Sequence, residues 1–402
     1  MPGTIRTGNY QLIKTINRWA VMNLLTKRSP ISRADMARHT GLSSTTISAT
    51  IDELLREGLI GETGIGDSSG GRKPVLFEIN PHGRYVIVAD LGGTKLLTAV
   101  VGLDGRPIRR FYSLVDAATQ DSVLGSLMQG LQTAWDSVGE PRKVLGIGIA
   151  TPGLVDHERG VVAFASNLHW HNIRLKDLVA DRFDVPVYVD NDTNVAAIGE
   201  KMRGVDIPCK NLVYVSIGTG IGAGIIIDGK VYRGVSGAAG EIGHITVDPE
   251  GPECSCGNRG CLEAVASGPA IAQMARATYN ARGGHGGPAG AGGGGEWTAE
   301  RVAELATQGD EIAVEAFRKA GTTLGIALSG IVNLLNPELM IIGGGVSQVG
   351  DLLLEPLRQE ISRRALSMSL RAVPIIQSRL GADSGLMGAW AMVFEETFTG
   401  GL

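Results

Sequence analysis

One short segment of this 402-residue chain combines the residue types that bind metal ions. His244 is followed by Cys254, Cys256 and Cys261, with two glycines between the last two cysteines. One imidazole and three thiolates form a closed tetrahedral set for zinc, which leaves no position for a catalytic water. We therefore predict a structural zinc ion. A redox-active cysteine pair is the alternative, although Cys-x-Cys lacks the usual two-residue spacer.

Two carboxylates flank this cluster. Glu241 lies three residues before His244, and Glu263 lies two residues after Cys261. A segment that a metal ion holds rigid can present two carboxylates and an imidazole to several sugar hydroxyls. We predict that Glu241, His244 and Glu263 bind a sugar, and surface ion pairs are the alternative. Cys209 stands apart and is expected to be a small buried side chain.

Three glycine-rich corners each follow an apolar run that is typical of a buried strand, at residues 85–91, 213–217 and 339–342. Backbone amides in such corners can surround a phosphate, and a nearby carboxylate can hold magnesium through water. The third corner suits close approach by a nucleotide base, and a simple tight turn is the alternative for any one of them. The predicted ATP and magnesium residues are Asp90, Gly92, Gly93, Thr94 and Lys95, then Gly218, Thr219 and Gly220, and finally Gly343, Gly344 and Gly345.

The first two corners repeat a larger pattern. Each is followed by a second strand, predicted at residues 96–102 and 225–227, and then by an Asp-Gly turn. The two copies lie about 128 residues apart in the sequence. This repetition indicates an internal duplication, with two similar α/β lobes that each contribute one hairpin to a ligand cleft.

Between these two copies, a strand at residues 187–191 runs into the start of a helix. Asp192 at this position can accept a proton from a bound hydroxyl. It can equally serve only as a helix cap, which is the commoner role of Asp there. Residues 282–296 are also rich in glycine, but they follow a helix rather than a strand. We predict a flexible insertion there and assign no metal to its His285.

The first 80 residues have the features of a winged helix-turn-helix. Helices are predicted at residues 9–27, from Ser32 to about His39, and from Ser43 to about Glu57, with a three-residue turn before the third. Two strands, at residues 59–63 and 75–80, surround a glycine-rich loop. The predicted DNA contacts are Ser43, Ser44, Thr45, Thr46 and Ser48 at the helix start, and Arg72 and Lys73 in the wing. A helical oligomerisation domain with a solvated basic loop is the alternative.

Composition and charge agree with a DNA-reading module joined to a different domain. Residues 1–84 carry 11 Lys and Arg against 7 Asp and Glu, a net +4, whereas the remainder carries 26 against 34, a net −8. Only 5% of residues are aromatic, which disfavours a base-stacking platform for single strands. We predict no membrane span, no secretory signal and a cytoplasmic protein.

The segments 240–244 and 254–263 resemble the signature of the ROK family of repressors, uncharacterised reading frames and sugar kinases. With residues 232–237 and the winged head, the chain is most similar to the xylose-repressor branch. The resemblance implies an α/β fold, in which a winged helix-turn-helix precedes a two-lobed actin/hexokinase-like domain of the duplicated ribonuclease H type. We expect a DNA-binding domain at 1–80 and a sugar-kinase-like domain at 84–402. Lobe one is expected at about 84–205 plus 383–402, and lobe two at about 206–382.

The resemblance also implies roles for individual residues. The position of Asp192 is that of the base which deprotonates the sugar in the family's kinases. Five further positions match residues that contact the sugar in the family: Gly153, Asn191, Glu241, His244 and Glu263. Many repressors of the family have lost the phosphate loops or this Asp, whereas here both are present.

Two functions follow from the resemblance. The first is a dimeric or tetrameric repressor of carbohydrate metabolism, which binds double-stranded operator DNA and responds to a monosaccharide such as xylose. The second is an ATP-dependent, glucokinase-like sugar kinase that retains a DNA-binding head, and the two can coexist in one chain.

Overall fold

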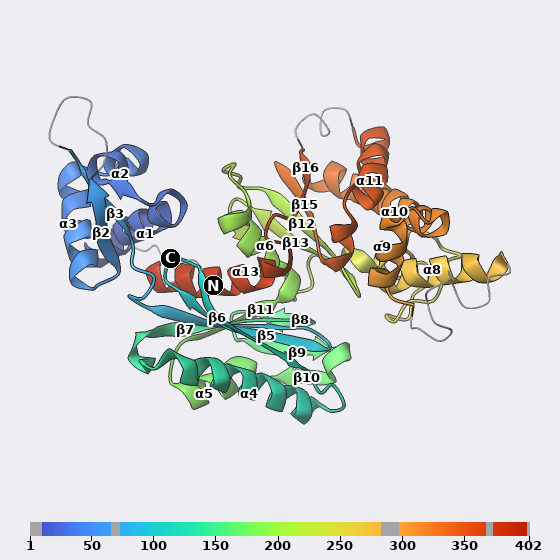
Figure 1. The fold of residues 1–402 in the computed structure, drawn as a ribbon, viewed down its shortest axis with the longest axis horizontal. Helices are drawn as coiled ribbons and strands as arrows, with labels where there is room; N and C mark the ends of the chain where they lie inside the picture. Colours follow the sequence, from blue (N-terminus) through green and yellow to red (C-terminus); the bar gives the residue numbers. More distant parts are fainter. Residues whose placement is uncertain (1–9, 66–72, 283–296, 367–372, 400–402) are drawn as a thin grey trace. The chain divides into compact units, whose positions relative to one another are not determined.

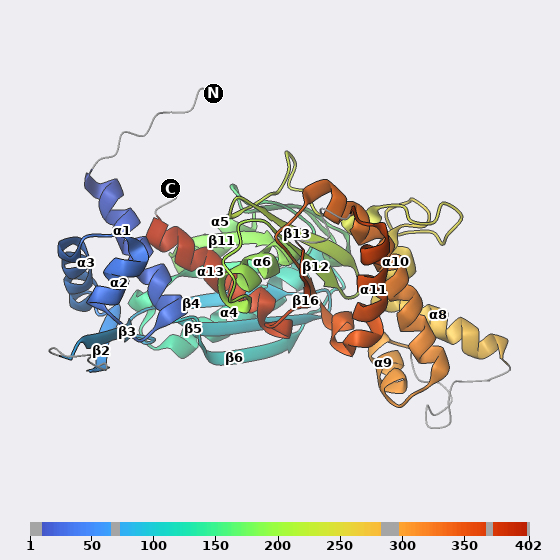
Figure 2. The same cartoon turned by 90° about the horizontal axis from the view of Figure 1, so that it is seen from above.

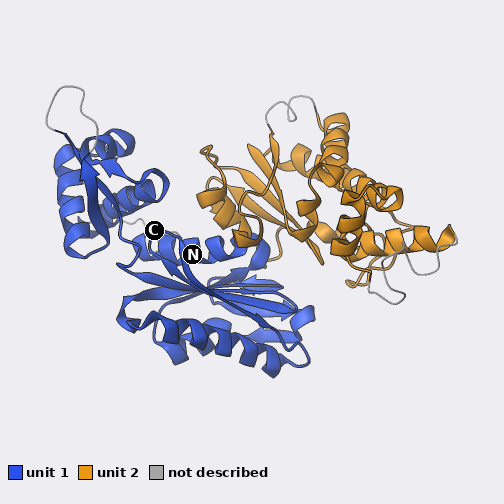
Figure 3. Ribbon diagram, viewed as in Figure 1, with its two compact units in different colours: residues 1–195, 385–402 blue, residues 196–384 orange. Residues whose placement is uncertain are grey.

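The computed structural model describes residues 10–65, 73–282, 297–366 and 373–399. The chain forms two compact units, Met1–Val195 with Gly385–Leu402 and Ala196–Ser384 (Figures 1 and 3). Within the described ranges, every helix is too short or too polar to cross a bilayer.

The head consists of three helices and a three-stranded sheet of order β1-β3-β2. Local sequence rules explain its helix starts. Ser43 Oγ accepts the amide of Thr46 at 3.1 Å, and Ser32 Oγ accepts that of Asp35 at 3.2 Å. The elements are α1 (Tyr10–Arg28), β1 (Ile31–Ser32), α2 (Arg33–Thr40), α3 (Ser44–Arg56), β2 (Ile60–Ile65) and β3 (Val75–Ile79).

Two details of the head go beyond the sequence expectation. The carboxylate of Asp35 accepts a hydrogen bond from the Ser32 hydroxyl, so the two side chains bond to each other at the start of α2. The short strand β1 pairs with β3 and was not expected, because two residues give no periodic signal. Most of the predicted wing, residues 66–72, lies outside the described residues.

Unit 1 continues with a five-stranded sheet of order β11-β7-β4-β5-β6. Helices α4 and α5 pack on the sheet, and the backbone of α13 approaches Gly148 of β7 on its other side (Figure 1; Figure 2 looks down through the stacked layers). The elements are β4 (Tyr85–Leu91), β5 (Lys95–Gly102), β6 (Pro107–Leu114), α4 (Gln120–Val138), β7 (Val144–Thr151), β8 (Leu154–Asp156), β9 (Val161–Ala165), β10 (Trp170–Ile173), α5 (Leu175–Phe183), β11 (Val187–Asn191), α6 (Asp192–Gly199) and α13 (Ser384–Thr399).

The sheet of unit 2 has the order β14-β13-β12-β15-β16. In both sheets the first three strands are antiparallel neighbours, and the last two add in parallel beside the first. This shared topology confirms the predicted duplication. The elements are a π-helical turn (Glu200–Gly204), β12 (Leu212–Ile217), β13 (Ile221–Ile227), β14 (Lys230–Val231), α7 (Leu262–Ala266), α8 (Gly268–Ala281), α9 (Ala299–Thr307), α10 (Glu311–Leu335), β15 (Leu339–Gly343), α11 (Asp351–Arg364) and β16 (Ile375–Gln377).

One predicted strand start was wrong. Strand β13 begins at Ile221 rather than at residue 225, and Gly222 pairs with Ser216 of β12. The ladder is made by backbone groups, so glycines within a hairpin can belong to it. The predicted insertion at 282–296 and its His285 fall almost entirely outside the described residues.

Candidate functional site

In unit 1, the parallel strands β4, β7 and β11 bring the predicted residues to one edge of the sheet. Asp90 pairs in register with Ala150, and Ala150 pairs with Asp190. The chain segments that follow these strands therefore emerge side by side, at the carboxyl ends where α/β sheets bind ligands. Asp90, Gly153, Asn191 and Asp192 are brought together there.

Asn191 fixes the geometry at the start of α6. Its Oδ1 accepts the amides of Thr193 at 3.0 Å and Asn194 at 3.2 Å, and its Nδ2 donates to the carbonyl of Gly153 at 3.0 Å. These bonds leave one Nδ2 hydrogen for a ligand. Asp192 follows in the first turn of α6, half-buried, with its Oδ1 2.7 Å from the amide of Thr193.

The electrostatics of this edge centre on two carboxylates. Burial, and to a smaller extent the neighbouring Asp192 carboxylate, together raise the pKa of Asp90 to about 7. A carboxylate in such an environment gains most from a cation that neutralises it. The arrangement can therefore hold a divalent ion beside a proton-accepting group.

The predicted phosphate hairpin between β4 and β5 is tighter than expected. The amide of Gly92 donates to the carbonyl of Lys95 at 2.8 Å, and the amide of Val115 donates to that of Thr94 at 3.0 Å. The Gly92 amide is therefore used by the turn itself. The Lys95 side chain is exposed at the start of β5.

Unit 2 presents the equivalent edge. Strands β12 and β15 are parallel, with Ser216 opposite Gly343, so the corners at Gly218 and Gly344 lie at the same edge. The Gly218 amide donates to the carbonyl of Gly220 at 2.9 Å, which parallels the closure of the first hairpin. Gly345 is exposed, and no atom lies within 4 Å of where a Cβ would be.

The predicted metal ligands converge in unit 2. One donor atom from each of His244, Cys254, Cys256 and Cys261 lies within 4.8 Å of all the others. Cys256 Sγ and Cys261 Sγ are 3.7 Å apart, and so are Cys254 Sγ and His244 Nδ1. Zinc–sulfur bonds of ~2.3 Å place two tetrahedral sulfur ligands ~3.8 Å apart. The separation fits metal ligands and is far too long for a disulfide of ~2.05 Å.

The pKa values of two thiols in this cluster are shifted in opposite directions. The backbone amide of Asn258 lowers the pKa of Cys256, whereas burial raises the pKa of Cys261 to about 12. A bound cation deprotonates coordinating thiols outright. A metal ion bound by these residues would therefore offset the cost of burying the negative charge of the Cys261 thiolate.

His244 has two distinct sides. Its Nδ1 faces Cys254, while its Nε2 lies 3.9 Å from Glu241 Oε2. An Nδ1-ligated imidazole can still donate Nε2–H to a carboxylate or a sugar hydroxyl, so one residue can serve both predicted roles. Burial raises the pKa of Glu241, and the Glu263 carboxylate adds to this while His244 opposes it.

Glu263 has a structural contact that the sequence did not indicate. Its Oε2 accepts the amide of Ile221 at 3.0 Å, beside Gly220. The carboxylate thus joins the first turn of α7 to the hairpin between β12 and β13.

The head presents the predicted helix start to solvent. Ser44 and Thr45 are exposed, whereas the hydroxyls of Ser43 and Thr46 lie 2.8 Å apart and bond to each other. Ser48 is half-buried, and Lys73 is exposed at the end of the wing. Arg72 lies outside the described residues.

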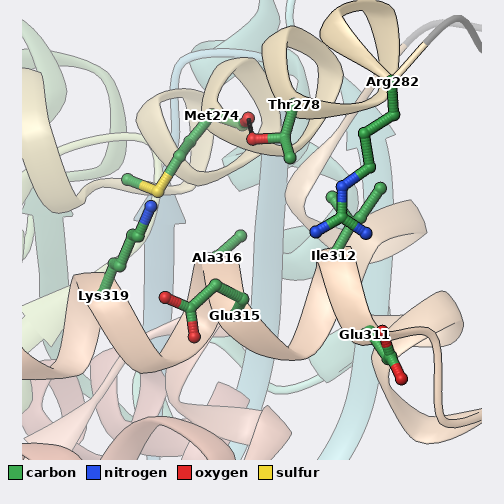
Figure 4. A pocket seen from close by; sticks show the side chains of 8 residues that line it. All are labelled: Met274, Thr278, Arg282, Glu311, Ile312, Glu315, Ala316 and Lys319. Carbon is green, nitrogen blue, oxygen red and sulfur yellow. Dashed lines mark hydrogen bonds between the residues drawn. The ribbon is translucent and has the colours of Figure 1, made fainter.

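Several neighbours of these sites were missed. Asp190 is 1% exposed and accepts the Asn191 amide at 2.8 Å, and the first turn of α13 packs against Asp90. No local pattern marks either contact. A cavity of about 470 Å³ between α8 and α10 contains none of the predicted site residues (Figure 4); it is lined by Met274, Thr278, Arg282, Glu311, Ile312, Glu315, Ala316 and Lys319.

Most of the chain matches a known family. The model of the ROK family matches residues 86–396, most of the chain. The chain belongs to the ROK family. A winged helix-turn-helix DNA-binding model matches residues 14–60, in agreement with the fold of the head.

Relatives of two kinds share this ROK architecture. The chain is 35% identical to a xylose repressor of Caldicellulosiruptor bescii over 97% of its own length and 98% of that protein. It resembles the crystal structure of a ROK family transcriptional regulator homologous to E. coli MLC, at 32% identity and TM-score 0.81, covering 97% and 98% of the two chains. A Streptomyces griseus ROK glucokinase in complex with glucose and AMPPNP matches at 35% identity and TM-score 0.68, over 77% of this chain and 98% of that one.

Proposed function

We propose that this ROK protein is a sugar-responsive transcriptional repressor of carbohydrate metabolism. The observation that carries the proposal is a winged helix-turn-helix at residues 14–60 in the same chain as a ROK domain at 86–396. A relative named as a xylose repressor spans both parts. Residues 1–80 would bind double-stranded operator DNA, and the kinase-like domain, residues 84–402, would bind a monosaccharide, with xylose as the first candidate.

For DNA, the start of α3 would enter the major groove. Ser44 and Thr45 are exposed there and offer hydroxyls to base edges, with Ser48 beside them. Ser43 and Thr46 bond to each other, so they would act mainly by fixing the helix start. Lys73 and Arg72 would neutralise phosphates. Self-association as a dimer or tetramer would present paired recognition helices to two half-sites.

For the sugar, unit 1 would supply Gly153, Asn191 and Asp192, and unit 2 would supply Glu241, His244 and Glu263. Carboxylates and an amide are the groups that bind vicinal hydroxyls. Zinc bound by His244, Cys254, Cys256 and Cys261 would hold Glu241 and His244 in place. A four-ligand site of this kind supplies structural cross-linking, and the sugar contacts come from the side chains around it.

Fluorescence anisotropy on full-length, zinc-loaded protein tests the repressor. We expect binding to double-stranded operator DNA that weakens steeply with salt and is released by one sugar of a panel. The panel contains xylose, glucose, fructose, mannose and N-acetylglucosamine. Binding without sequence preference, or insensitive to every sugar of the panel, would refute the proposal. Ser44→Ala with Thr45→Ala should relax sequence preference while leaving sugar binding unchanged.

A second activity is favoured by the proximity of Asp90 and Asp192 and by the complete glycine corners. We propose that the chain can also act as an ATP- and magnesium-dependent sugar kinase. The Asp192 carboxylate would take the proton of a sugar hydroxyl, whose oxygen attacks the γ-phosphorus while ADP leaves. Asp90 would hold magnesium through water, and Lys95 with the three corners would bind the nucleotide.

A coupled ADP-release assay with the same sugars tests the kinase. Turnover with one sugar that Asp192→Asn reduces by about 10²–10⁴-fold would support it. Absence of turnover with every sugar, in protein that contains one zinc per chain, would refute the kinase activity. The repressor would then be the only proposed function. Asp116→Asn, an exposed carboxylate of the same unit, is the matched control.

A further inference from the structure

The chain crosses between the two units twice, and both crossings involve helices. The first lies inside α6, between Val195 and Ala196, and the second lies at the start of α13, between Ser384 and Gly385 (Figure 3). A helix interior resists bending, so rotation between two units is absorbed where such helices end. The residues at those ends are therefore candidates for a hinge.

On the unit 2 side, one carboxylate bonds to both crossing segments. Helix α6 continues into the π-helical turn at Glu200–Gly204, and Glu200 is 1% exposed. Its Oε1 accepts the hydroxyl of Ser378, the hydroxyl of Ser384 at 2.9 Å and the amide of Leu380 at 3.2 Å. Glu200 thus follows the first crossing by a few residues and binds the last residue before the second.

The other oxygen of Glu200 is unusual. Among the described residues, Oε2 has no hydrogen-bond partner, and Glu200 forms no ion pair. Oε2 lies against Gly204, where a Cβ would be 1.8 Å away. A buried carboxylate that is only half satisfied is costly to keep. π-helical turns occur frequently at functional sites, which supports a role beyond packing.

On the unit 1 side, the same two segments touch through their backbones. A Cβ on Gly388 of α13 would lie 1.7 Å from the carbonyl oxygen of Val195 in α6. The two crossing segments are therefore adjacent within unit 1. Both helices also reach the candidate site, because α6 begins at Asp192 and a Cβ on Gly385 would lie 2.4 Å from Asp90 Oδ2.

We propose that Glu200 is a positioning residue of an interdomain hinge, which holds the two crossing segments together and thereby sets the response of the protein to ligand at Asp90 and Asp192. This inference rests on the proposed function for the identity of that ligand. Glu200 does not touch the ligand. It acts through α6, whose first turn carries Asp192, and through Ser384, which begins α13.

Distance measurement between spin labels, with and without the sugar panel, tests the hinge. Labels on unnatural amino acids replace Tyr112 in unit 1 and Leu334 in unit 2, both more than 70% exposed. We expect one narrow distance distribution in the parent protein, and a broader one in Glu200→Ala without any sugar. We also expect the sugar concentration at half-response to shift by at least about fivefold in Glu200→Ala.

Glu360→Gln is the matched control. Glu360 is a buried carboxylate of the same unit, 8% exposed, and it bonds to Arg363 and Arg364 in α11, away from both crossings. The Glu360→Gln substitution should lower the Tm without changing the distance distribution between the spin labels. If Glu200→Ala does not fold, Glu200→Gln and Ser384→Ala take its place, because each removes only part of the network.

The outcomes separate the two proposals. A Glu200→Ala protein with the parent's distance distribution and sugar midpoint would overturn the hinge. A broadened distribution in Glu200→Ala, together with a parent protein that responds to no sugar, would support the hinge and overturn the proposed function. Equal broadening in Glu200→Ala and Glu360→Gln would reduce Glu200 to a stabilising residue and also overturn the hinge.

Discussion

The two sheets share one topology but hold different chemistry at the same edge. The edge of unit 1 carries the carboxylates of Asp90 and Asp192, placed by strand register and by the Asn191 cap. The edge of unit 2 carries glycine corners and, nearby, the four potential metal ligands. The contrast teaches that duplication fixes where a ligand can bind, whereas the residues at each strand end decide what that edge can do.

The two sheet edges also differ in how they affect the stability of the fold. Unit 1 keeps buried charge at its edge, which destabilises the fold unless a cation binds. Unit 2 has no such carboxylate at its strand ends among the described residues, and its ligand cluster would gain stability from a metal. Four substitutions, in order of decreasing expected effect, test this contrast.

The metal cluster should give the largest effect. Cys261→Ser is expected to abolish binding of one zinc per chain and to lower the Tm by more than about 10 °C, since a structural zinc contributes on the order of 10 kcal/mol to the folding of zinc-finger peptides. Metal analysis and calorimetry measure both. Cys209→Ser, outside the cluster, is the control and should change neither. A Cys261→Ser protein that still bound one zinc per chain would show that Cys261 is not a zinc ligand, and the proposed difference between the two units would fail.

The buried carboxylate of unit 1 should give a pH-dependent effect. The folded pKa of Asp90 is raised to about 7 from 3.8, so the folded state retains a proton that the unfolded state has lost. Stability from this group is therefore greatest below pH 4 and is lost as pH rises toward 7, by up to about 4 kcal/mol. Urea unfolding should show Asp90→Asn gaining about 3 kcal/mol over the parent between pH 5 and pH 8.

Asp116→Asn, exposed in the same unit, provides the control for that pH profile. Its difference from the parent should be the same at both pH values. A constant difference for Asp90→Asn as well would mean that Asp90 is as well solvated as Asp116, and the contrast between the two edges would be lost.

The corner after β15 should give a smaller effect. Gly344 has φ +81° and ψ 166°, a conformation that only glycine adopts readily, and a Cβ there would lie 2.3 Å from the carbonyl oxygen of Ile217. Gly344→Ala is expected to lower the free energy of unfolding by about 2 kcal/mol. Gly345→Ala, beside it in open space, should change it by less than about 0.5 kcal/mol. Equal losses would show that the corner has no packing requirement of its own.

The cap of α6 should give the smallest effect. Asn191→Ala removes its hydrogen bonds to Thr193, Asn194 and Gly153, and is expected to cost about 1–2 kcal/mol and to weaken sugar binding. Thr119→Ala removes the cap of α4 in the same unit and should cost about 1 kcal/mol without affecting sugar. If calorimetry showed unchanged sugar affinity in Asn191→Ala, Asn191 would only cap α6 and would not contribute to sugar binding.

Local signals were read correctly from the sequence where the physics is local. The starts of α2 and α3 depend on a serine hydroxyl and an amide three residues later, which the sequence displays directly. The strand and glycine patterns predicted both hairpins and the duplication. The extent of β13 was misread, because glycine suggests a turn while the ladder requires only backbone groups.

The sequence alone determined the membership of the ROK family, the winged head and the four residues that converge as a metal cluster, because each depends on residue types at short spacing. Only the tertiary structure decided that Asp90 lies near Asp192, that Glu263 binds the Ile221 amide and that Glu200 bonds to Ser384. These pairs are separated by 42 to 184 residues. Contacts at such separations follow from sheet register and chain crossings, which no local pattern encodes.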